Sequence, residues 1–219
     1  MADLVTNINR AIADFDSIKS AIEDKGVTVG NAPTSKYADR IAKIQSSETQ
    51  YLYNSEGRIY AEDLVIPDGI AKIGAQAYYL CDIKSLIIPN SVKSIGNSAF
   101  NGCKYLTNLV IPEGVGVLGQ NAFYSCPIDT LYLPSTLASM GASVFSSQYL
   151  RNVMLGQGFN FSINISGGTY DVDVMLAMFN ALKDNTGATA KTLQLGSKNL
   201  AKLTAEQIQI ATDKNWNVA

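Results

Sequence analysis

The chain has 219 residues, a formal net charge of −2 and 47% hydrophobic residues, a composition that suits one packed domain with a small appendage. Its lysines and arginines are scattered, so no basic stripe favours nucleic acid or an anionic membrane, and no apolar run approaches the roughly 20 residues of a membrane span. Because histidine is absent, Ser-His-Asp catalysis, Cys-His catalysis and His-ligated zinc are excluded, and we predict a non-enzymatic protein without catalytic, cofactor-binding or metal-binding residues.

Residues 1–46 are predicted to form a helical segment that attaches or oligomerises the protein. Apolar residues recur there at alternating steps of four and three, the heptad pattern of a coiled coil, until Lys25-Gly26 ends the pattern. We favour self-association as a dimer or trimer; the alternatives are an amphipathic helix folded onto the next domain as a cap, or disorder. The positions expected to carry oligomerisation are Leu4, Ile8, Phe15, Ile18 and Ile22.

Residues 47–156 contain four copies of one short pattern. Each copy has an apolar triplet followed by proline, and the prolines at positions 67, 89, 112 and 134 are 22, 23 and 22 residues apart. Further along each copy an apolar residue precedes a glycine, and a small residue precedes an aromatic one. A fixed period near twenty residues predicts a solenoid, because each unit is too small to bury its own apolar face and must stack on its neighbours.

The alternation Leu-x-Ile within one unit predicts a strand of about three or four residues, with two side chains pointing inward and one outward. The proline ends the strand because it lacks a backbone donor. We expect the glycine to give the next turn its conformational freedom, and the Ala-Phe pair to start a short helical return whose ring fills the interior. Equivalent side chains of successive units should then lie above one another.

Two motifs in the repeats resemble chemical sites. Cys81, Cys103 and Cys126, stacked at neighbouring turns, are compatible with a metal site or a disulfide, but the position needs a small apolar filler, so we predict buried thiols. The stretch from Gly114 to Gly119 fits the GxGxxG fingerprint of dinucleotide sites. The repeat register explains these glycines and no long helix follows, so no cofactor is expected.

Residues 157–219 are predicted to form atypical terminal repeats and a cap, which shields the last core face from water. The segments 153–155 and 193–195 continue the series as a fifth and a sixth strand. A loop over 156–170 and a helix capped by Asp173 should lie between them. The inward face of that helix is expected to be Leu176, Phe179 and Leu182, and Thr204 with Gln207 predicts a capping box for a last helix.

The outward strand positions predict the surface that meets a ligand or partner. They form a mostly apolar column beside a small polar column, and a continuous exposed apolar strip tends to be covered by a partner, a ligand or a neighbouring subunit. The alternative is that β-branched residues simply favour strands. Phe159 and Phe161, on the glycine-flanked loop, are a second candidate contact. The predicted contacts of the two columns are Val65, Ile87, Val110, Tyr132, Met154, Gln194, Asn108, Thr130 and Asn152.

The pattern LxIPxxVxxIGxxAFxxC, almost intact from Leu86 to Cys103, resembles the leucine-rich repeats of the BspA-like type found in bacterial surface proteins. The resemblance covers residues 61 to 156. It implies an α/β leucine-rich repeat solenoid with short parallel strands, to which the N-terminal helical segment is added.

Two other segments resemble bacteriophage proteins. The arrangement AIxxKGVxV, Ala21 to Val29, followed by SKYADRIAKI looks like N-terminal segments of tail and fibre proteins. The ending from Lys191 to Ala219 is similar to C-terminal ends of repeat proteins from phages and prophages of gut bacteria. The first residues show no secretory signal pattern, and assembly into a virion released by lysis would bring such a protein outside.

These resemblances imply a phage virion surface component, a tail or head fibre. Residues 1–46 would attach to other virion proteins and form a homo-oligomer, and the solenoid would bind a host surface glycan or protein. The alternative is a bacterial cell-surface adhesin that binds host or microbial ligands. A carbohydrate-active enzyme is disfavoured, because nothing in the sequence sets two carboxylates facing each other.

Overall fold

The computed structural model describes the chain from residue 60 to residue 219. The five predicted oligomerisation positions, Leu4, Ile8, Phe15, Ile18 and Ile22, lie outside the described residues, as does the rest of the predicted attachment segment. Their role stays a prediction.

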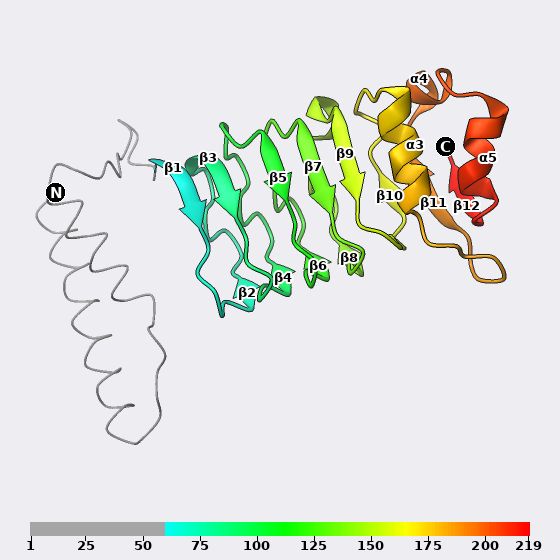
Figure 1. Ribbon diagram of the computed structural model, residues 1–219. Coiled ribbons are helices and arrows are strands. Elements are labelled where there is room, and N and C mark those ends of the chain that lie inside the picture. The colour runs from blue at the N-terminus through cyan, green and yellow to red at the C-terminus, as the bar shows by residue number, and fades with distance from the viewer. Residues whose placement is uncertain (1–59) are drawn as a thin grey trace, which may run out of the picture. The chain divides into compact units, whose positions relative to one another are not determined.

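The repeats form a solenoid in which short parallel strands lie side by side in two rows (Figure 1). The front strands are β1 (Tyr60–Val65), β3 (Asp82–Ile87), β5 (Asn108–Val110), β7 (Thr130–Leu133) and β9 (Asn152–Leu155). The back strands are β2 (Lys72–Ile73), β4 (Ser94–Ile95), β6 (Val117–Leu118) and β8 (Ser139–Met140). Equivalent residues of neighbouring copies pair, as in Val65 with Ile87, so the predicted stacking of short parallel strands is confirmed.

The hydrogen-bonded ladder of the front strands is interrupted between β3 and β5, whereas the four back strands form one ladder. The second copy has one residue more than the first between its cysteine and the next strand. A turn forms there, in which the Leu106 amide donates to the Cys103 carbonyl at 3.3 Å. Tyr105 then points outward while Leu106 is buried, so the interior stays in register.

The aromatic residues of the four copies form one stack through the core. Ring centroids lie 5.1 Å apart for Tyr78 and Phe100, 5.1 Å for Phe100 and Phe123, and 5.9 Å for Phe123 and Phe145. Stacked rings of this kind contribute about 0.5–1.5 kcal/mol per pair beyond the area that they bury. The predicted placement of aromatic above aromatic is therefore confirmed.

The predicted helical return after each glycine is wrong, because the segment is a series of turns. Ser98, Asn121 and their equivalents Gln76 and Ser143 have positive φ angles of 52° to 57°, which a helix does not allow. The backbone N–H groups of this segment donate alternately to a carbonyl of the same turn and to a carbonyl of the next coil. The Phe100 amide, for example, donates to the Ala122 carbonyl of the next coil at 2.8 Å.

The repeat glycines allow adjacent coils to approach each other closely. A Cβ atom on Gly96 would lie 2.6 Å from the Ala75 nitrogen, and one on Gly119 would lie 2.5 Å from the Asn97 nitrogen. The sequence-based expectation of conformational freedom is therefore wrong for these positions: their φ angles are not in the left-handed region, and it is the space of a Cβ atom that is missing.

The three cysteines are buried free thiols, as predicted. The Cys103 sulfur donates to the Tyr78 carbonyl at 3.4 Å, and the Cys126 sulfur donates to the Phe100 carbonyl at 3.1 Å. Burial, with the charge of the neighbouring Asp82, raises the pKa of the Cys81 thiol. These thiols act as apolar fillers and as weak donors between coils.

The C-terminal part adds a further parallel sheet, of three strands, and helices that pack beside it. The elements are η1 (a 3-10 helix, Ser147–Tyr149), β10 (Ile163–Asn164), α3 (Val172–Ala181), β11 (Lys191–Gln194), α4 (Ser197–Leu200), α5 (Ala205–Thr212) and β12 (Trp216–Val218). The sheet order is β10-β11-β12. The predicted fifth and sixth strands are confirmed as β9 and β11, but the expected loop over 156–170 contains a further strand, β10.

Two helix caps were predicted, and one is confirmed. The Gln207 amide donates to the Thr204 hydroxyl at 3.3 Å and the Thr204 amide donates to the Gln207 side chain at 2.9 Å, which is the expected capping box of α5. Helix α3 begins after Asp171 and not after Asp173. The inward face of α3 consists of Met175, Met178 and Phe179, followed by Leu182, while Leu176 is only half-buried.

A buried asparagine joins the C-terminal elements. Asn199 is 1% exposed, accepts a hydrogen bond from the Tyr170 amide at 3.0 Å, and donates to the carbonyls of Gly168 at 3.0 Å and Leu195 at 2.8 Å. Both side-chain N–H groups and the side-chain oxygen of Asn199 are therefore engaged, and the bonds to Tyr170 and Gly168 join segments that are about 30 residues apart in sequence.

Candidate binding surface

Five outward side chains occupy the equivalent position on successive front strands, in one group on β1 and β3 and one on β5, β7 and β9, and we call them the apolar ladder: Val65, Ile87, Val110, Tyr132 and Met154. Four of these side chains are between 42% and 58% exposed, while Tyr132 is half-buried. Strand pairing places Val65 opposite Ile87, and Tyr132 between Val110 and Met154. The alternation of the strands explains the exposure, since Leu86 and Ile88 on either side of Ile87 point into the core. The sequence thus predicted the position of every ladder residue.

A polar border runs beside the apolar ladder, two residues before the ladder position of the same strand, as Asp63 is before Val65 and Asn152 is before Met154. The Ser85 hydroxyl donates to the Asp63 carboxylate of the neighbouring strand. The side-chain NH2 group of Asn152 donates to the Asp129 carboxylate at 3.3 Å and to the Thr130 hydroxyl at 3.5 Å. Asn108, on β5, is exposed and donates to the adjacent Thr107 hydroxyl at 3.3 Å. These hydrogen bonds hold the polar side chains in place at the edge of the apolar ladder.

A fixed carboxylate, which sequence reasoning missed, lies next to the apolar ladder. Glu113 accepts hydrogen bonds from the Tyr132 hydroxyl at 2.9 Å and from the Ser135 amide and hydroxyl, both at 3.0 Å. Desolvation raises the pKa of Glu113, but the hydrogen bonds from Ser135 and Tyr132 outweigh it and lower the pKa below its usual value. A Cβ atom on Gly156 would lie 2.5 Å from this carboxylate, so the glycine leaves room for it.

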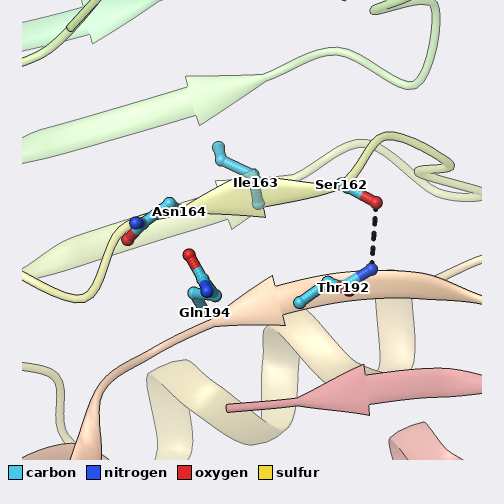
Figure 2. Close-up of a pocket in the computed structure, with 5 residues that line it drawn as sticks. All are labelled: Ser162, Ile163, Asn164, Thr192 and Gln194. Carbon is cyan, nitrogen blue, oxygen red and sulfur yellow. Dashed lines mark hydrogen bonds between the residues drawn. The ribbon is translucent and has the colours of Figure 1, made fainter. Parts of the chain in front are cut away.

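At the C-terminal end of the front face the outward positions become polar and line an open pocket of about 290 Å³ between β10 and β11 (Figure 2). The lining residues are Ser162, Ile163, Asn164, Thr192 and Gln194. Asn164 and Gln194 are directly opposite each other in the parallel pair, and the Thr192 amide donates to the Ser162 hydroxyl at 3.0 Å. The sequence predicted the outward position of Gln194, but it did not predict β10 and therefore missed Asn164 and Ser162.

The predicted contact at Phe159 is wrong, because this side chain is fully buried. Its ring stacks on Trp216 at 6.5 Å, and the Phe159 backbone forms a bridge with Leu182 at the end of α3. The apolar ring gains more from this packing than from a loop surface, since the cap needs a core of its own. Phe161 is half-buried and is only partly available as a contact.

The described part of the chain contains neither a candidate metal cluster nor a helix that could span a membrane. Among residues 60–219, no group of three Cys, Asp or Glu side chains is arranged so that it could hold a metal ion. No helix in this part is long and apolar enough to cross a membrane.

Comparisons with known proteins identify the repeats. Residues 62–166 match the sequence model of the BspA type leucine-rich repeat region, in six copies. No curated protein matches the chain. Two solved structures are similar: the pneumococcal vaccine antigen PcpA, with 18% identity over 53% of this chain and 36% of that one and a TM-score of 0.37, and a leucine-rich cell surface protein of Faecalibacterium prausnitzii, with 14% identity over 72% and 59% and a TM-score of 0.29.

The chain spans less than two thirds of either of these proteins. The matched range includes four of the front strands, β3 to β9, all four back strands and β10. The stacked coils that carry the apolar ladder are therefore BspA-type leucine-rich repeats.

Proposed function

We propose that this chain is a non-enzymatic adhesive protein of the bacterial cell surface, which binds a host or microbial protein or glycan through its front face. The apolar ladder carries this proposal. Four of its side chains are 42–58% exposed at the equivalent outward position of successive front strands, and exposed apolar patches of this kind mark interaction sites. The polar border beside it matches the usual anatomy of an interface, in which an apolar centre has a polar rim.

The chemistry of the front face supports binding and not turnover. Glu113 is the carboxylate next to the ladder, and both of its oxygens accept hydrogen bonds from Tyr132 and Ser135. The lowered pKa keeps it ionised at neutral pH, so it is unsuited to act as a general acid. The chain also contains no histidine that could take over acid–base chemistry.

Binding can be tested with substitutions that place charge on the apolar ladder. The full chain is assayed against arrays of glycans and of purified host and bacterial surface proteins, as wild type and with Ile87→Lys and Val110→Lys combined. We expect the double variant to lose at least tenfold in affinity for a partner that the wild type binds, without turnover of that partner. Val117→Lys is the matched control, because Val117 is 44% exposed but lies on back strand β6. Equal affinity of the double variant and the wild type would show that the apolar ladder is not the binding surface.

A second candidate is a virion surface component, with residues 1–46 as the attachment segment. Its support is the resemblance of residues 21–44 and 191–219 to phage proteins. We rank it below the cell-surface adhesin, because the family of the repeats is known from bacterial surface proteins. Capsid, portal and tail genes beside the coding gene would favour the virion.

The oligomer belongs to the same proposal and is measured separately. We expect the full-length protein to have the mass of a dimer or trimer in solution, held together by the heptad positions of the N-terminal segment. A monomer at high concentration would instead favour the interpretation of that segment as a cap.

A further inference from the structure

We infer that the pocket between β10 and β11 is a binding site for a neutral saccharide. The inference rests on the proposed function, since it assigns a ligand class to one end of the same front face. The lining side chains carry two hydroxyl groups and two carboxamides, and none of them is charged. A sugar presents hydroxyl groups that both donate and accept hydrogen bonds, which is the chemistry that such a lining satisfies.

The four polar side chains are set in place by the parallel strand pair. Asn164 and Gln194 are register partners, which places their Cβ atoms about 5 Å apart, close enough for both carboxamides to reach one sugar ring. At the other end of the pocket, Ser162 and Thr192 are joined by the 3.0 Å hydrogen bond from the Thr192 amide to the Ser162 hydroxyl (Figure 2).

Hydrogen bonds within the protein occupy some of the polar groups that line the pocket and leave others available to a ligand. The Asn164 carbonyl oxygen accepts from the amide of Ser166 at 3.0 Å and from its hydroxyl at 2.8 Å, which fixes the orientation of the carboxamide. Its NH2 group is left to donate to a ligand. Among the described residues, the Gln194 carboxamide has no hydrogen-bond partner, so it offers both a donor and an acceptor.

The lining also selects against charged ligands. A carboxylate or an ammonium group in this open pocket finds no opposite charge among the lining side chains, so it gains no ion pair for the water that it gives up on contact. A neutral sugar exchanges water for hydrogen bonds of the same kind. The site should therefore prefer neutral sugars to sugar acids.

The test follows the side-chain NH2 signals of the full-length, ¹⁵N-labelled protein by NMR. Glucose, galactose and N-acetylglucosamine are titrated separately, with glucuronate as the charged comparison. We expect at least one neutral sugar to shift the NH2 signals of Asn164 and Gln194 saturably, and glucuronate to bind more weakly. Gln194→Leu should weaken the affinity about fivefold to tenfold, the effect of one lost hydrogen bond. Gln157→Leu, at an exposed glutamine outside the pocket, should leave it unchanged.

Two results would overturn the inference: no saturable shift with any of the three neutral sugars, or the same affinity in Gln194→Leu as in the wild type. Tighter binding of glucuronate than of every neutral sugar would overturn the stated ligand class. The outcome is separable from that of the proposed function. Loss of partner binding in the ladder variant without any sugar binding would reject the pocket alone, and sugar binding with an unaffected ladder variant would reject the role of the ladder alone.

Discussion

Replacement of Gly119 by alanine should destabilise the solenoid, although alanine is the smallest possible change. The added Cβ atom would lie 2.5 Å from both the Asn97 nitrogen and the Gly96 carbonyl carbon, where ordinary contacts are 3.4–4 Å. Both neighbours are backbone atoms, so the coils must move apart by nearly 1 Å, a distance that also weakens the hydrogen bonds between them. Overpacking of this kind costs about 1–3 kcal/mol. For a protein of this size, a loss of 2 kcal/mol lowers the Tm by about 4–8 °C.

The measurement is thermal and urea unfolding of the full chain, followed by circular dichroism. Gly116→Ala is the matched control, because Gly116 lies in the same coil as Gly119 and its Cβ atom would lie at an ordinary 3.6 Å from the Thr136 carbonyl oxygen of the next coil. Gly74→Ala changes the equivalent repeat position where no described atom lies within 4 Å, and should be neutral or stabilising by up to about 1 kcal/mol. If Gly119→Ala proves as stable as Gly116→Ala, the idea that the glycine serves close approach between coils is wrong.

Three further perturbations test other parts of the structure. Phe123→Ala removes a fully buried ring from the middle of the aromatic stack and should lower the free energy of unfolding in urea by about 3–5 kcal/mol. Tyr124→Ala, at an exposed neighbour, should change it by no more than about 0.5 kcal/mol. Equal losses of stability in the two variants would contradict a stabilising role of the stack. Because the folded-state pKa of Glu113 is lowered, the stability that Glu113 contributes is present above the unfolded pKa of about 4.3 and is lost as the pH falls through the folded-state pKa. The Tm difference between wild type and Glu113→Gln should therefore shrink on acidification. A Tm difference that does not change with pH would show that the ionised Glu113 carboxylate does not stabilise the fold. Asn199→Ala breaks three buried hydrogen bonds and should lower the unfolding free energy by about 3 kcal/mol or more, and an unchanged urea midpoint would show that this asparagine does not join the cap.

The repeat pattern alone was sufficient to predict the stacked strands of the regular part of the fold, although it did not predict the turns that take the place of the expected helical return. Periods of 22 and 23 residues require stacking, and the Leu-x-Ile alternation assigns Leu86 and Ile88 to the core and Ile87 to the surface. The same register places the aromatic rings above one another. These features follow from local spacing, which a sequence displays directly.

The C-terminal part was less predictable because its units do not repeat. Strand β10 has only two residues, and its partner β11 begins almost thirty residues later, so no local pattern marks it. For the same reason Phe159 was assigned to the surface, although Trp216, which covers it, comes from the far end of the chain.

The sequence by itself therefore determined which side chains of each coil point inward, which point outward and where the apolar ladder runs, since strand alternation and the repeat period are local properties. Only the tertiary structure showed that the repeat glycines allow close approach of the coils, that the Glu113 carboxylate is held in place and that a pocket lies at Asn164 and Gln194. Each of these depends on atoms that residues from a different coil bring to within a few ångströms, and no single stretch of sequence contains both partners.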